Sequence, residues 1–137
     1  MKNQIMILAA TPILCLSGCS SRAIGSAPAA AQVRGAKVSV SQQDPTSRVY
    51  VPELVAVLSK HGFTVVGNEK AEYSATIDVN PGAWNINCNI TLSKNGVPIV
   101  SSNAINPGFG NLMTRGQNTD AVVHWALNAF DKKLSAQ

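Results

Sequence analysis

The chain has 137 residues, with 11 Lys or Arg, 7 Asp or Glu and a formal net charge of +4 at pH 7. A chain of this length is expected to form one domain, and its basic residues show no tight cluster, which disfavours nucleic-acid binding. Charged residues make up only 13% of the sequence, so we expect a neutral polar surface of the kind common in exported proteins.

The amino terminus carries an export signal that ends in a lipid-attachment motif. Lys2 precedes an apolar run, residues 5–16, that is too short to span a bilayer. The sequence LSGC at residues 16–19 matches the bacterial lipobox, in which the cysteine sulfur receives a diacylglycerol group. We interpret residues 1–18 as a lipoprotein signal peptide and predict lipidation, with incorporation of palmitate, at Cys19. The alternative is an ordinary secretory signal followed by a chance cysteine.

Ser20 follows the lipidated cysteine, where enterobacterial lipoproteins retained in the inner membrane have aspartate. We therefore predict a lipid anchor in the cell outer membrane, with the domain facing the periplasm. Residues 19–36 consist mainly of small residues without a periodic apolar face, which predicts a lipidated flexible tether. Residues 37–137 are then the single periplasmic domain.

Only one cysteine remains available in the mature chain. Cys15 leaves with the signal peptide and Cys19 takes the lipid, so Cys88 has no cysteine with which to form an internal disulfide. We predict that the Cys88 thiol is buried, because it alternates with apolar residues along a strand pattern. The residues expected beside it on the inner face of the sheet are Trp84, Ile86 and Ile90.

The first half of the domain is predicted to be a strand, a helix and two more strands. Residues 37–41 alternate and are followed by a polar turn. Pro52 suits the first turn of a helix, whose apolar face continues until Gly62 ends it. Strands are then expected over residues 63–67 and 73–80.

The second half is predicted to be a hairpin, a long loop and a helix. Residues 84–93 alternate cleanly, and Asn95-Gly96 is a strong signal for a hairpin leading into a strand at 97–100. Pro98 indicates that this returning strand lies at a sheet edge. Thr119 is the expected N-cap of the last helix. Its expected apolar stripe is Val123, Leu127, Phe130 and Leu134.

This order, β-α-β-β-β-β-α, predicts an α+β fold. We expect a two-layer sandwich, with a mostly antiparallel sheet of about four to five strands and two helices.

The sequence offers no arrangement of residues typical of catalysis. His61 and His124 have no Ser, Cys or Asp partner at a catalytic spacing. We expect His61 to be partly buried at a helix end and His124 to lie on the surface. Metal-ligand spacings and phosphate-binding glycine loops are also missing from the sequence. We therefore predict no enzyme, no cofactor and no metal.

Two features suggest contact with another protein. Residues 106–118 form a glycine-rich segment whose apolar residues Phe109, Leu112 and Met113 are predicted to bind a partner. Trp125 lies opposite the stripe of the last helix, where exposure would favour an interface. A second packing layer beside Val122 and Ala129 could equally bury it, and both alternatives stay open.

One face of the 84–93 strand is a row of polar residues, and it also has two interpretations. The row is either the solvated outer face of a sheet or a polar contact surface for a peptide, a glycan or another strand. Its members are Asn85, Asn87, Asn89 and Thr91.

Residues 54–66, LVAVLSKHGFTVV, with 71–77, AEYSATI, the Asn-Gly hairpin and the closing helix resemble small outer-membrane lipoproteins of the YajG-like family. They resemble, more loosely, the periplasmic domains of penicillin-binding-protein-activator lipoproteins. We expect a non-enzymatic binding or accessory module for an envelope protein partner, with a homo-oligomer also open. The helix-glycine-strand stretch is also similar to lipoproteins that accompany conjugative or secretion channels. The alternative role is therefore a structural accessory subunit of such an apparatus.

Overall fold

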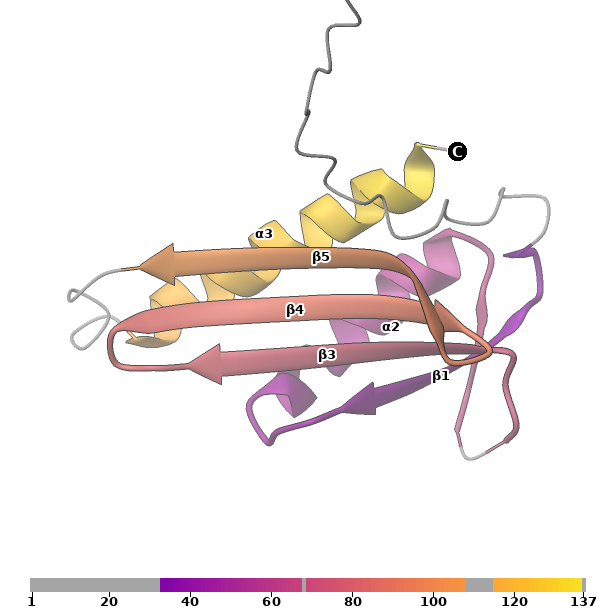
Figure 1. The fold of residues 1–137 in the computed structure, drawn as a ribbon, viewed down its shortest axis with the longest axis horizontal. Helices are drawn as coiled ribbons and strands as arrows, with labels where there is room; N and C mark the ends of the chain where they lie inside the picture. Colours follow the sequence, from indigo (N-terminus) through magenta and orange to yellow (C-terminus); the bar gives the residue numbers. More distant parts are fainter. Residues whose placement is uncertain (1–32, 68, 108–114, 137) are drawn as a thin grey trace, which may run out of the picture.

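The computed structural model describes residues 33–67, 69–107 and 115–136. These residues form a five-stranded sheet in the order β2-β1-β3-β4-β5, with helices packed on one face (Figure 1). The elements are β1 (Lys37–Gln42), the 3-10 helix η1 (Ser47–Tyr50), α2 (Val51–Lys60), β2 (Thr64–Val66), β3 (Tyr73–Pro81), β4 (Asn85–Lys94), β5 (Val97–Pro107) and α3 (Arg115–Ser135). The predicted α+β fold and order of elements are confirmed.

The sheet is mixed, with a parallel and an antiparallel half. β3, β4 and β5 form antiparallel pairs, as the hairpin signals predict. β1 instead pairs in parallel with both β2 and β3. A parallel pair needs a crossover connection, and η1 and α2 supply the one between β1 and β2. The parallel half was not predicted, because turn signals identify only strands that follow each other in sequence.

The core lies between the inner face of the sheet and the helices α2 and α3. Strand alternation directs Ile77, Ile86 and Ile90 inward, and each is 0% exposed. Leu54 and Leu58 of α2 are also 0% exposed. The predicted apolar stripe of α3 is confirmed by the burial of all its members, Val123, Leu127, Phe130 and Leu134.

The folded part begins before the predicted boundary at residue 37. Val33 is 3% exposed and belongs to the core, and the backbone N–H of Gly35 donates to the carbonyl oxygen of Gly62 at 2.7 Å. Residues 33–36 are therefore part of the domain rather than of the tether. The predicted signal peptide, Cys19 and the rest of the tether lie outside the described residues.

β5 and α3 both extend into the segment predicted as a loop. β5 runs to Pro107 instead of ending at Val100, and α3 begins at Arg115. Thr119 is thus a buried residue inside α3, not its N-cap. The added half of β5 escaped prediction because its buried position Ser102 is polar: its hydroxyl donates to the carbonyl oxygen of Ala126 at 2.9 Å.

The β4–β5 hairpin has the predicted turn. Asn95 and Gly96 both adopt positive φ, 50° and 80°, as a type I′ turn requires. β5 is an edge strand, so the position inferred from Pro98 is also confirmed.

Candidate partner-binding surface

His61 joins the end of α2 to α3. Its Nε2 lies 2.7 Å from Oδ1 of Asp131, and its side chain is 14% exposed. Lys60 Nζ lies 2.8 Å from the other carboxylate oxygen of Asp131. Hydrogen bonds from Lys60 and His61 hold the pKa of Asp131 below its ordinary value. The predicted partial burial of His61 is confirmed, and its contacts connect two helices.

His124 lies on the surface, as predicted. Its side chain is 58% exposed, with Nδ1 2.7 Å from the carbonyl oxygen of Asp120 and Nε2 3.3 Å from a carboxylate oxygen of Glu53. The two histidines therefore occupy separate parts of the domain, His61 at the end of α2 and His124 on the exposed side of α3.

Asp44 and Ser47 cover the backbone of β3 at the point where its neighbour β1 has ended. The N–H of Val79 on β3 donates to the Ser47 hydroxyl at 2.8 Å and to an Asp44 carboxylate oxygen at 3.2 Å. Asp44 also accepts from the Ser47 N–H at 2.8 Å and from its hydroxyl. Burial acts to raise the pKa of Asp44, but these hydrogen bonds outweigh it and the pKa is lowered. The Asp44 and Ser47 side chains thus satisfy the backbone N–H of β3 beyond the end of β1.

The described residues contain neither a candidate metal site nor a helix that could cross a membrane. No three His, Cys, Asp or Glu side chains among them gather closely enough to hold a metal ion. None of the helices in these ranges has the length and apolar character needed to cross a bilayer.

Cys88 is fully buried on the inner face of β4, as predicted. Burial raises the pKa of its thiol to about 12. Ile86 and Ile90 are buried on the same face, but Trp84 is 67% exposed and lies before the strand begins, so its predicted burial is wrong. The turn is tight at Gly82, where a Cβ would lie 2.6 Å from the Asn85 carbonyl oxygen. The alternating pattern therefore does not extend back to Trp84.

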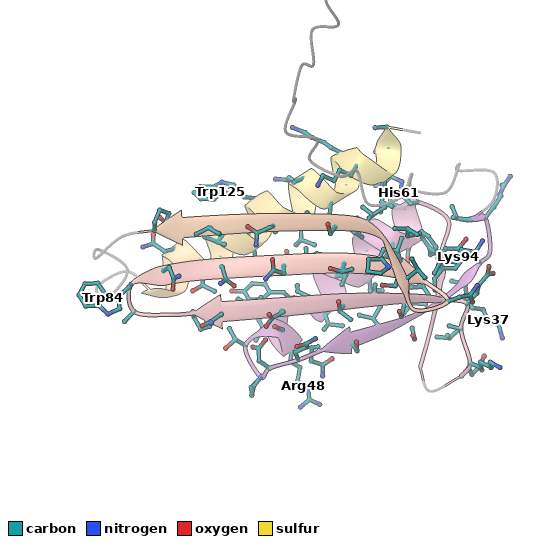
Figure 2. The ribbon with its side chains drawn as sticks, viewed as in Figure 1. Lys37, Arg48, His61, Trp84, Lys94 and Trp125 are labelled. Carbon is teal, nitrogen blue, oxygen red and sulfur yellow. The ribbon has the colours of Figure 1, made fainter. Side chains whose placement is uncertain are left out.

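Trp84 lies at the end of the long axis where β3 turns into β4 (Figure 2). We call this tryptophan and its turn, residues 82–85, the Trp84 end. Asn85 pairs with Pro107, so the connection from β5 to α3 begins beside it. The predicted binding residues in that connection, Phe109, Leu112 and Met113, lie outside the described residues.

Trp125 is 55% exposed, which resolves the two alternatives in favour of exposure. It is Val122 that is buried, at 0% exposed. Figure 2 shows Trp125 projecting past β5, on the side away from β4. It lies ten residues after the start of α3, about 15 Å along the helix axis. Trp125 therefore does not share one surface with the Trp84 end.

A second apolar side chain lies close to this sheet edge. Ile105 is 53% exposed on β5. Its register partner Asn87 neighbours the inward-facing Cys88, so Ile105 belongs to the open face of the sheet. We call the outer side of β5 from Ser102 to Pro107, with Ile105 and Trp125, the β5 edge.

The polar row of β4 lies on the same open face. Asn89 accepts a hydrogen bond from the Asn103 side chain of β5. Most register partners of the row on β3 and β5 are polar, and the exceptions are Ile105 and Pro107. Both interpretations of this row therefore remain open.

Comparison with known proteins yields solved structures only. No protein-family model and no curated protein sequence matches the chain. Similar structures include lipoprotein GNA1162 from Neisseria meningitidis, at 16% identity, 66% coverage of this chain, 95% coverage of that chain and a TM-score of 0.40. Protein VC0702 from Vibrio cholerae has 11% identity, coverages of 67% and 91% and a TM-score of 0.41. A minor lipoprotein from Acinetobacter baumannii has 10% identity, coverages of 77% and 91% and a TM-score of 0.40.

At this level of similarity the solved structures assign neither a family nor a function to the chain. The names of these three proteins do not include a YajG-like or penicillin-binding-protein-activator lipoprotein. That resemblance therefore stays a prediction.

Proposed function

We propose that the protein is an outer-membrane lipoprotein whose periplasmic domain binds another envelope protein without catalysing a reaction. The lipobox ending at Cys19 supports the anchor. The observation that carries the binding role is the exposure of Trp84, 67%, on a domain with few charged residues. Tryptophan is enriched at interfaces, where its large apolar area contributes strongly to affinity.

The direction in which the chain enters the domain supports this role. Lys37, at the start of β1, and Trp84 lie at opposite ends of the long axis (Figure 2). The anchor then attaches at one end of the domain and the Trp84 end faces away from that attachment.

The absence of catalysis is part of the proposal and rests on the positions of the titratable groups. His61 and Asp131 connect two helices, and Asp44 and Ser47 cover the backbone of β3. Each pair thus already performs a structural task.

The anchor is tested by replacing the lipidated cysteine. Cys19→Ser removes the sulfur that receives the diacylglycerol, so the variant should accumulate as an uncleaved precursor that incorporates no labelled palmitate. Cys88→Ser is the matched control and should be processed normally, because Cys88 is buried in the domain. Normal cleavage and labelling of Cys19→Ser would show that the lipoprotein interpretation is wrong.

The binding role is tested by a crosslinking pull-down from intact cells. Trp84→Ser should reduce capture of the partner by roughly thirtyfold, the effect of losing about 2 kcal/mol at an interface hot spot. Val49→Ser is the control, because Val49 is 71% exposed on η1, outside the turn of residues 82–85. The combined replacement of Phe109, Leu112 and Met113 by serine should lose the same partner. Equal capture by all variants would contradict the proposal.

The identity of the captured protein separates the two roles of the domain. A partner belonging to a conjugation or secretion apparatus would favour the structural accessory role. Any other envelope protein would favour the binding module.

A further inference from the structure

Among the described residues, no strand pairs with the outer side of β5. The carbonyl oxygen of Ser101 accepts from Lys133 Nζ at 2.5 Å and so faces away from β4. The N–H and C=O of one strand residue point to the same side, and successive residues alternate. Asn103 and Ile105 therefore also direct their backbone groups outward, while the intervening Ala104 bonds to β4. No described strand lies beyond β5.

Within the part of the chain that the structure describes, features that protect this edge occur only in its first half. Pro98, a register irregularity opposite Leu92 and Ser93, and the Lys133 contact all lie between residues 97 and 101. Proline, bulges and lysine are the devices that proteins use to prevent pairing at sheet edges. The half from Ser102 to Pro107 has no charged residue and only its terminal proline. Such an edge is a template for another strand.

The exposed apolar residues beside this half lie in both layers of the fold. Ile105 is on the open face of the sheet and Trp125 is in the helix layer, and each is more than half exposed. A single peptide strand would pair with the backbone and contact Ile105, but Trp125 lies in the layer beneath. An occupant that covers both needs a strand edge with a helix packed under it. A second copy of this domain has this arrangement.

Charge also favours a second copy. Residues 97–107 contain no ionisable side chain, so two β5 strands meet without like-charge repulsion. In an antiparallel pair centred near Ala104, the Lys133 side chains of the two copies lie at opposite ends of the contact. The interaction is then isologous, with the same surface contributed by each copy.

We infer that the protein forms a homodimer in which the β5 edges of two copies pair antiparallel, joining both sheets into one. This contact is separate from the proposed partner contact at the Trp84 end. It buries Ile105 and Trp125 of both copies.

Thiol crosslinking of the full-length chain in intact cells tests this arrangement. Ile105→Cys, treated with a short bis-maleimide, should give a dimer on a reducing gel. The parent chain is the blank, because Cys88 is buried. Val49→Cys is the matched control, since Val49 is 71% exposed on η1. The dimer yield should exceed this control by on the order of tenfold, because pairing fixes the two thiols at high effective concentration.

A second substitution tests the strand pairing itself. Asn103→Pro removes an outward-facing N–H, so adding it to Ile105→Cys should abolish the crosslinked dimer. Trp125→Ser, which leaves β5 unchanged, should reduce the yield as well. Equal yields from Ile105→Cys and Val49→Cys, or no dimer from Ile105→Cys, would overturn the inference. An adduct of Ile105→Cys with a different protein would also overturn it, because a foreign strand would then occupy the edge.

Discussion

The two edges of the sheet differ in length and in protection. β2 has three residues, and beside it Lys37 and Glu69 form an exposed ion pair at 2.8 Å. β5 has eleven residues, and its uncharged second half lacks such protection. A short edge flanked by charge offers little backbone for another strand, whereas a long neutral edge offers a template. The two proposed contact surfaces lie where strand backbone or large apolar side chains are exposed.

A thiol on the inner face of the sheet should react far more slowly than a thiol on the exposed surface of η1. Because burial raises the pKa of Cys88 to about 12, its thiolate population at neutral pH is roughly a thousandfold below that of an ordinary cysteine. In native Val49→Cys protein, maleimide labelling followed by mass spectrometry should modify the introduced thiol at least about a thousandfold faster than Cys88, because Val49 is 71% exposed on η1. Denaturation should equalise the rates. Rapid labelling of native Cys88, or a disulfide-linked dimer of the parent, would contradict its burial.

A pair of proline variants distinguishes the backbone N–H groups of β5 that face β4 from those that face outward. Ala104→Pro removes a donor that bonds to β4 and should lower the free energy of unfolding by about 3 kcal/mol. Asn103→Pro removes an outward donor and the side-chain contact to Asn89, and should cost about 1 kcal/mol. Urea unfolding of both variants measures the difference. Equal destabilisation would show that the alternation assigned to β5 is wrong.

A third stretch of strand backbone, at Val79, has its N–H hydrogen-bonded by side chains instead of by a neighbouring strand. Ser47→Ala removes the acceptor 2.8 Å from the buried Val79 N–H, which should lower the free energy of unfolding by about 1–3 kcal/mol. Ser41→Ala, at an exposed position of β1, is the control and should stay within about 0.5 kcal/mol of the parent. If the two variants unfold at the same urea concentration, the hydrogen bond from Val79 to Ser47 does not stabilise the sheet.

Replacing Asp131 should have a small effect, seen mainly in the stability of the domain at low pH. The pKa values of Asp44 and Asp131 are lowered in the folded state, so their contribution is present above the unfolded value, about 3.9, and is lost as pH falls through the folded value. Asp131→Asn should remove about 1 kcal/mol or less at neutral pH. It should also flatten the decline between about pH 5 and 2. An acid profile identical to that of the parent would contradict the role given to Asp131.

The parts of the fold that are encoded locally were predictable from the sequence. Asn95-Gly96 requires positive φ at both positions, Pro98 cannot donate within a central ladder, and the α3 stripe follows from helical spacing. The parallel placement of β1 depends on long-range packing that no local signal reports. Burial of Val33 likewise depends on contacts made after the domain folds.

The candidate site was predictable only in part. Trp125 was identified from its helical position, but its exposure required knowledge of the whole helix layer. Trp84 was misassigned because alternation alone cannot show where a strand begins. The β5 edge was missed because Ser102 is polar, and a polar residue at a buried position hides the alternation of the strand.

Photo-crosslinking in intact cells, with the crosslinker placed in turn at residues 84, 105 and 49, tests both proposed contacts at once. Positions 84 and 105 represent the two proposed contact surfaces, and position 49 is an exposed apolar site outside both. We expect an adduct with a different envelope protein from position 84, an adduct with a second copy from position 105, and neither from position 49. The same pattern of adducts at all three positions would contradict this expectation.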